Sequence, residues 1–320
     1  MSAGLGAGLS ATVNVVRAEL FKVTRKRRAY LMALFLWALF PALLLLVGWL
    51  VQTRISGALV EDAVSLNALV QAIASPYALS RNVLLLLGNS SPNLLMVVVA
   101  LLAALLIGEE RANNTWKAVL TNQPNRLAVL AGKVVALMLV LGVLLLGAYL
   151  FGLLLGLLGT LFLPTTPAGA WGELAGLYLL QWAFALAAVL FASLLVWLIR
   201  SLPVAIVAIF FLPAMLEGAV SFYLVTSGLN LTNRITALLQ ALRLRQLAET
   251  LPQYFLSTNL YAPARRPLAE LGEVFGAGAF GGPLAGLFTA DLGRAALVLL
   301  GYGLLFGGLL AWSFTRRDVA

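Results

Sequence analysis

The sequence contains no cysteine and no histidine, and only 10% of its 320 residues are charged. The absence of cysteine excludes disulfides and thiol nucleophiles. The absence of histidine removes the commonest side-chain base and disfavours zinc and haem sites. A phosphate-binding GxxxxGK[ST] loop is also missing, because the only Gly-Lys pair, Gly132 and Lys133, is followed by valine and lacks the earlier glycine. We therefore expect no catalysis, no metal and no cofactor in this chain.

Apolar residues are abundant where charge is scarce: 62% of the chain is hydrophobic and the mean hydropathy is +0.99. A soluble domain carries roughly 25% charged residues, and its core could not enclose this much leucine. The sequence therefore predicts a polytopic membrane protein. The 21 basic and 12 acidic residues give a net charge of +9. Because the bases flank apolar segments, we expect lipid around the chain and no nucleic-acid partner.

Apolar runs of about 20 residues, the length that crosses ~30 Å of hydrocarbon, predict an all-α membrane protein with six spans. The second span has a short apolar core that follows Pro92 and Asn93, so we expect it to extend outward past Pro92 with a kink. Apolar sequence follows the third span as far as Leu163, which favours tilting or projection beyond the bilayer. The spans are predicted near residues 30–51, 91–107, 134–157, 174–199, 202–225 and 295–314.

We predict that residues 1–29 form a cytoplasmic tail with an amphipathic elbow helix, and that residues 30–320 form one membrane domain. Val13, Val16, Leu20 and Val23 recur at helical spacing, with charged residues on the other faces. The pattern favours a helix that lies in the inner membrane interface, and a solvated juxtamembrane tail is the alternative. The bases before the first span and its full length argue against a cleavable signal peptide.

The distribution of Lys and Arg favours a topology with both termini in the cytoplasm, in a bacterial cytoplasmic membrane. In this orientation 13 of the 21 basic residues lie inside. Most of the other eight lie around the outer loop 226–291, which is too long for the positive-inside rule to apply. The inner bases are Arg17, Lys22, Arg25, Lys26, Arg27, Arg28, Arg111, Lys117, Arg126, Lys133, Arg200, Arg316 and Arg317.

The polar stretch 108–133 is the longest inner connection between apolar runs. It contains paired carboxylates at Glu109 and Glu110, a helix-start signal that ends at Thr115, and a breaker at Pro124. Such a stretch has to lie in water. We predict that one span ends here, a short surface helix follows over 115–120, and the next span begins after a turn.

Two outer segments are longer than simple turns. Residues 52–90 mix apolar and polar side chains and predict a partly helical cap. In the outer loop 226–291, Ile235, Leu238 and Leu242 share the apolar side of a predicted helix, which Pro252 ends. The glycine-rich stretch 272–286 predicts a surface or re-entrant segment.

Three segments resemble the type-2 ATP-binding cassette (ABC) permeases. AELFKVTRKRRAY is similar to the interfacial elbow of that family, and SFTRRDVA is similar to its common finish of an aromatic residue, Arg and Asp. From Glu109 to Lys133 the sequence follows the family's order of acid, Thr or Trp-Lys, Leu, Pro, Arg and Lys. The variant WKAVLTNQPNR looks closest to the branch that includes lantibiotic-immunity permeases.

The resemblance implies the permease subunit of an ABC exporter, paired with a second permease as a homodimer or heterodimer. It implies that the loop 108–133 couples to a separate ATPase dimer, which binds the ATP, and that Trp116 is an exposed anchor; an interfacial tryptophan without a partner is the alternative. The implied coupling residues are Glu109, Glu110, Thr115, Trp116, Lys117, Leu120, Pro124 and Arg126, and the implied elbow residues are Glu19, Lys22, Arg25, Lys26, Arg27 and Arg28.

Glu217 is the one acid placed within an apolar span, where exposure to lipid would cost about 2.5 kcal/mol or more. We therefore expect it to face protein, water or a pathway. A tight turn at Arg200 and Ser201 would bring Gln181 and Glu217 to similar depths, so a hydrogen bond between them is possible. The pair could clamp two helices together or contact the substrate, and the sequence favours neither role.

Two other function classes are weighed against the permease. A secondary transporter or channel usually carries several intramembrane charges or corresponding broken helices, and this sequence has one such acid and no internal repeat. A membrane enzyme would need a nucleophile with a neighbouring base, which no predicted span provides. Dependence on a separate ATPase distinguishes the permease from both.

Overall fold

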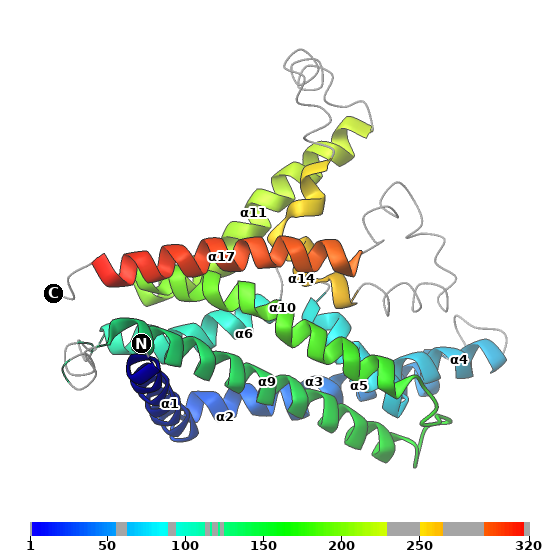
Figure 1. Cartoon of the computed structure of the whole chain (residues 1–320). Helices are drawn as coiled ribbons and strands as arrows, with labels where there is room; N and C mark the ends of the chain where they lie inside the picture. Colours follow the sequence, from blue (N-terminus) through cyan, green and yellow to red (C-terminus); the bar gives the residue numbers. More distant parts are fainter. Residues whose placement is uncertain are drawn as a thin grey trace.

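The computed structural model describes residues 2–55, 63–88, 94–112, 116, 121, 125–228, 250–264 and 291–316. Every regular element within these residues is helical (Figure 1). Among the described residues, five helices are long and apolar enough to cross a membrane, and they correspond to five of the six predicted spans. These helices are Arg27–Arg54, Arg126–Gly159, Trp171–Leu198, Leu202–Val220 and Leu292–Arg316.

The second predicted span corresponds to α6 (Leu94–Ala103) and the π-helical turn η3 (Ala104–Gly108), and the short helix α7 (Glu109–Ala112) follows it in the predicted loop. Its described apolar part, residues 94–108, is 15 residues long, or about 22 Å at ~1.5 Å per residue. This length is shorter than the ~30 Å of a hydrocarbon core. The described part of this segment is therefore too short to cross alone.

The first long helix contains two π-helical turns. Its parts are α2 (Arg27–Leu34), η1 (Phe35–Leu39), α3 (Phe40–Leu50) and η2 (Val51–Ile55). Pro41 lies just after η1, and its ring excludes the usual hydrogen bond to the preceding turn. A π-helical turn next to a proline lets the helix continue past it.

Helix α9 (Arg126–Gly159) is the long central helix of the bundle. It begins where the Oδ1 atom of Asn125 accepts a hydrogen bond from the backbone N–H of Ala128, at 3.1 Å. The inner loop predicted for 108–133 is therefore too long, because residues 126–133 already belong to α9. The charged side chains at 126 and 133 suggested a loop, but the cap at Asn125 starts the helix before them.

Helices α4 (Ala63–Ala74) and α5 (Pro76–Gly88) confirm the helical character predicted for residues 52–90. Helix α5 packs closely on α9, because Gly152 and Gly156 leave room for its backbone. A Cβ atom at Gly156 would lie 2.3 Å from the Cα atom of Pro76. Small residues spaced four apart are a common way for membrane helices to approach each other.

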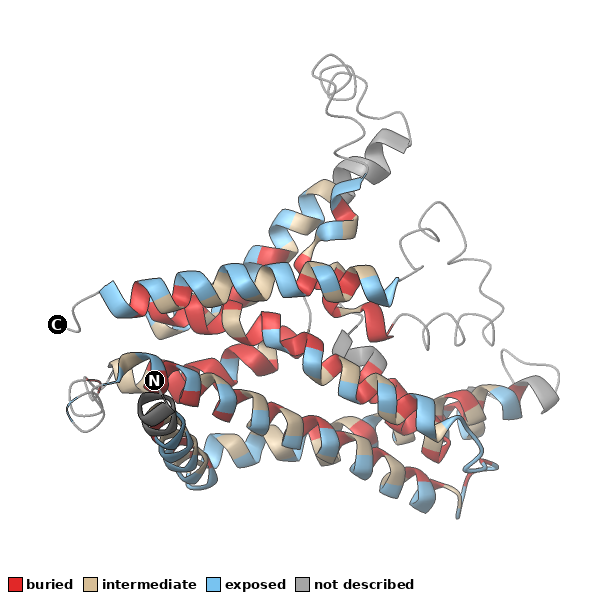
Figure 2. Ribbon diagram, viewed as in Figure 1, coloured by how far each residue is buried: buried red, intermediate tan, exposed pale blue. Residues whose placement is uncertain are grey.

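Helix α10 (Trp171–Leu198) is the most enclosed of the long helices, with α6, α9 and α17 (Leu292–Arg316) packed around it (Figure 2). A tight turn at Arg200 and Ser201 joins it to α11 (Leu202–Gly228), as predicted. Helix α11 leans away from the rest of the bundle and keeps much of its surface exposed (Figures 1 and 2).

The segment before α17 contains η4 (Leu251–Tyr254) and α14 (Leu256–Leu260). The hydroxyl of Tyr302 on α17 donates to the carbonyl of Tyr254, at 3.0 Å. Pro252 lies in η4. The predicted helix containing Ile235 and the glycine-rich stretch 272–286 lie outside the described residues.

Candidate functional site

The first helix, α1 (Ser2–Thr24), packs across the start of α9. Its buried stripe runs through Ala11, Glu19 and Val23, which are four or eight residues apart. Gly132 permits the close approach, since a Cβ atom there would lie 2.7 Å from the Cβ atom of Val15. Residues 2–24 are helical, but the predicted apolar face is wrong in part, because its residue Val13 is exposed and Glu19 is buried.

Glu19 is buried because it forms an ion pair with Lys133. The Lys133 ammonium lies 2.6 Å from Glu19 Oε1 and 2.9 Å from Glu110 Oε2. It also donates to the carbonyl of Leu106 at 3.1 Å, and its side chain is 0% exposed. A buried ammonium is tolerated only when its charge and its hydrogen bonds are satisfied. Lys133 thus ties together α1, η3, α7 and α9.

Further ion pairs surround this buried centre. Lys22 contacts Glu19 at 3.0 Å and also pairs with Glu110. Lys26 and Arg28 both approach Glu109, at 2.6 and 2.8 Å. We call the seven residues the elbow network: Glu19, Lys22, Lys26, Arg28, Glu109, Glu110 and Lys133.

The charges of the elbow network reinforce each other at neutral pH. Burial raises the pKa of Glu110, but attraction by Lys133 and the hydrogen bonds from Lys22 and Lys133 outweigh it, so the pKa falls below its ordinary value. Burial lowers the pKa of Lys22, but Glu110 and Glu19 outweigh it and raise the pKa above its ordinary value. Both groups are therefore held in their charged forms.

Arg111 connects α7 to the C-terminal end of α10. Its guanidinium donates to the carbonyl of Trp197 and, at 3.4 Å, to that of Val196. It also lies 5.3 Å above the Trp197 ring. These carbonyls belong to the last turn of α10, where backbone acceptors lack helical partners. Arg111 thereby caps α10 from the same short helix that carries the two glutamates.

Trp116 is buried, so the prediction of an exposed anchor is wrong. Only 2% of its surface is exposed, and its ring lies 5.5 Å from Trp197 and 5.2 Å from Phe314. The Lys133 ammonium lies 5.1 Å from the Trp116 ring centre. Its polar neighbours in sequence indicated water, whereas the ends of α10 and α17 cover the indole.

The other predicted coupling and elbow residues are distributed more widely. Arg126 donates to the carbonyl of Thr315 at 3.3 Å, at the end of α17. The Arg25 guanidinium lies 4.2 Å from the Phe21 ring, and Arg27 is exposed. Four predicted coupling residues lie outside the described part of the chain: Thr115, Lys117, Leu120 and Pro124.

The predicted hydrogen bond between Gln181 and Glu217 is not formed. Gln181 is fully buried, and neither polar atom of its amide has a hydrogen-bond partner among the described residues. Glu217 Oε1 instead accepts from the backbone N–H of Ser257 at 3.0 Å, in the first turn of α14. The carboxylate bonds to α14 because a helix N-terminus offers free N–H groups.

We predict that Glu217→Leu destabilises the protein by about 1–3 kcal/mol, because it leaves the buried N–H of Ser257 without an acceptor. Glu217→Gln keeps an acceptor and should cost less. Denaturant unfolding of the two purified variants measures the difference. Equal free energies of unfolding for the leucine and glutamine variants would show that the hydrogen bond to Ser257 contributes nothing.

The elbow network brings together two groups of predicted residues that the sequence places far apart. Glu19 and Lys133 are separated by 114 positions. From the sequence, Lys133 looked like one more basic residue of the loop. The signal for its burial was the adjacent Gly132, whose lack of a side chain lets α1 pack against α9. Within the described residues no three acidic side chains gather in a way that could hold a metal ion. The elbow network links α1, α7 and α9 through ion pairs.

Comparison with protein families places these elements in a known context. The family model described as "ABC-2 family transporter protein" matches residues 15–216. The match includes residues 15–24 of α1, the whole elbow network and α10. A comparison with curated proteins gave no significant match.

Proposed function

The chain belongs to the ABC-2 family of transporter proteins and is a membrane permease subunit, and we propose that it couples the export of its substrate to a separate ATPase. The observation that supports coupling is the elbow network. Lys133 on α9 is held by Glu19 of α1 and Glu110 of α7. A push on the inner loop after α7 would therefore move α1 and α9 together.

The proposed partners follow from the family. Two ATPase subunits bind and hydrolyse the ATP, and a second permease subunit, identical or different, completes the pathway. Closure of the ATPase pair on nucleotide would press on the loop after α7. The elbow network and the Arg111 cap on α10 would then carry the movement into the spans, which rock from inward to outward access.

We further propose that the chain crosses the membrane six times, with α5 and α6 together as the second crossing. Pro76 lies beside Gly156 near the outer end of α9, and Leu106 lies beside Lys133 near its inner end. Gly156 and Lys133 are 23 residues apart in one helix, or about 35 Å. The chain between Pro76 and Leu106 therefore covers the thickness of a bilayer.

The position of α1 in the inner interface is part of the same proposal. Leu9, Val13 and Phe21 are exposed on α1, where they would enter the headgroup region. The WKAVLTNQPNR motif favours the branch that includes lantibiotic-immunity permeases. Gln181 and Glu217 remain candidates for the pathway, because the buried amide of Gln181 leaves its polar atoms open to a water or a substrate group.

Co-purification of an ATPase subunit tests the proposed coupling. Wild-type protein, extracted from its native membrane, should retain a P-loop ATPase. Lys117→Glu should reduce its recovery at least tenfold, which corresponds to about 1.4 kcal/mol. Arg200→Glu is the matched control, since it reverses an exposed charge at the short turn between α10 and α11. Equal losses in both variants would remove the loop from the interface, and absence of any ATPase would favour a secondary transporter.

The orientation has its own test, because the chain has no native cysteine. Ala168→Cys, in the exposed turn between α9 and α10, should react with an impermeant reagent added to intact cells. Ser201→Cys, in the turn between α10 and α11, should be protected. The reverse pattern would invert the proposed topology.

A further inference from the structure

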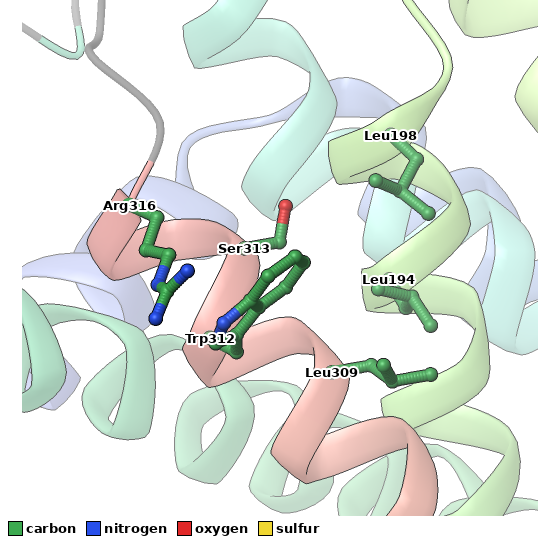
Figure 3. A pocket seen from close by; sticks show the side chains of 6 residues that line it. All are labelled: Leu194, Leu198, Leu309, Trp312, Ser313 and Arg316. Atoms are coloured by element: carbon green, nitrogen blue, oxygen red, sulfur yellow. The ribbon is translucent and has the colours of Figure 1, made fainter.

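A pocket of about 270 Å³ lies between the inner ends of α10 and α17 (Figure 3). Most of its wall is aliphatic or aromatic, with a hydroxyl and a guanidinium toward one end. The lining residues are Leu194, Leu198, Leu309, Trp312, Ser313 and Arg316. Its volume is below the ~300–1,000 Å³ of sites that enclose whole small molecules. The pocket therefore suits one hydrocarbon chain better than a complete apolar ligand.

Arg316 places a positive charge at the end of this apolar slot. It is exposed, and its guanidinium lies 5.2 Å from the ring of Trp312. Trp312 is itself 56% exposed, as an aromatic side chain at the membrane interface commonly is. The slot thus joins an apolar wall, an interfacial tryptophan and a cation within about two helical turns of α17.

Two helix C-termini meet beside the slot, and their free carbonyls would normally repel an anion. Arginines cover these carbonyls. Arg111 donates to the last turn of α10, and Arg126 donates to the carbonyl of Thr315 in α17. Arg200 follows α10 by two residues and is exposed. These arginines offset the negative ends of the two helices beside the slot.

Ser313 adds a polar group between the apolar wall and the cation. Its Oγ atom accepts a hydrogen bond from the Trp197 indole at 3.2 Å, so its own proton can be donated to another acceptor. An ester oxygen of a glycerolipid lies between its acyl chain and its phosphate. Along the slot, the apolar wall, the Ser313 hydroxyl and the Arg316 guanidinium follow one another in the same order as the acyl chain, the ester and the phosphate of such a lipid.

We propose that this slot binds one anionic glycerophospholipid, with an acyl chain between α10 and α17 and the phosphate on Arg316. The proposal rests on the orientation given above, which puts the slot in the leaflet that carries anionic lipid. Basic pockets between helices on the cytoplasmic side commonly bind such headgroups. The bound lipid would bridge α10, which Arg111 joins to α7, and the last helix of the chain.

Native mass spectrometry of the purified full-length chain tests the proposal without any ATPase, so its failure is separable from failure of the coupling. Phosphatidylglycerol should bind about fivefold more tightly than phosphatidylcholine with the same chains, the factor for about 1 kcal/mol per basic side chain. Arg316→Gln should abolish this preference. Arg17→Gln, which removes an exposed arginine from α1, should retain it.

A second measurement locates the lipid. Phosphatidylglycerol with brominated chains should quench the fluorescence of Trp312, and Trp312→Phe should remove that component. Leu198→Trp should fill the slot and weaken the binding of both lipids. Equal binding of the two lipids to wild-type protein, or equal effects of Arg316→Gln and Arg17→Gln, would overturn the proposal. A lipid-free dimer with an unquenched Trp312 would instead assign the slot to a second copy of the chain.

Discussion

Replacing Lys133 by methionine is expected to destabilise the protein by about 3–5 kcal/mol. The Lys133 side chain is 0% exposed, and those of its partners Glu19 and Glu110 are 3% and 11% exposed. Removing one member of a buried ion pair leaves the opposite charge without compensation, which costs more than the pair itself contributes. Lys22 still contacts both carboxylates, so the loss should fall toward the lower end of the range.

Denaturant unfolding of the purified protein in detergent measures this loss, and Lys22→Met provides the control. The Lys22 side chain is 40% exposed, so its removal should cost no more than about 1 kcal/mol. Adding Glu19→Gln to Lys133→Met should restore part of the stability, since it removes one unpaired carboxylate. If Lys133→Met were no more harmful than Lys22→Met, the buried centre of the elbow network would have no special energetic role.

Truncating Trp116 to alanine is expected to destabilise the protein by about 3–5 kcal/mol, the range for truncation of a buried aromatic side chain. The indole packs against Trp197 and Phe314, and its loss would leave a cavity at the C-terminal ends of α10 and α17. Lys133 would also lose its aromatic neighbour. Weaker association with an ATPase should follow as a secondary effect of a displaced inner loop.

Trp116→Phe separates packing from the indole N–H. That N–H has no hydrogen-bond partner among the described residues, so phenylalanine should retain most of the stability and most of the ATPase association. Trp49→Ala is the matched truncation, because Trp49 is 40% exposed and should tolerate it. Unfolding and co-purification are measured on all three variants. Normal stability of Trp116→Ala with lost ATPase binding would restore the exposed-anchor interpretation.

The five long apolar helices could be predicted because each depends on a local run of apolar residues. The start of α9 was misplaced, since the charges of Arg126 and Lys133 carry no information about whether a partner lies nearby. Lys133 is stable inside the bundle only through Glu19, 114 positions away. Such a pairing depends on how α1 packs across α9, and neither charge nor periodicity encodes that packing in a single sequence.

The prediction that Trp116 is exposed was wrong for a related reason. Polar neighbours show that a segment borders water, but they do not show which side chains turn back into the protein. Burial of Trp116 depends on Trp197 and Phe314, which lie in two later helices. Glu217 was expected to need a partner, and its partner is the backbone N–H of Ser257 in α14. A backbone donor leaves no mark in the side-chain pattern of the sequence.

The buried lysine also constrains how the chain is assembled during synthesis. Glu19 leaves the ribosome first, Glu110 follows, and Lys133 comes last. The lysine cannot enter its dry position until both carboxylates are in place, because an unpaired ammonium there is too costly. Docking of α1 must therefore accompany closure of the bundle around α9. Nascent chains in which α1 fails to dock keep this lysine in water, and they remain open to the proteases that remove incompletely folded proteins.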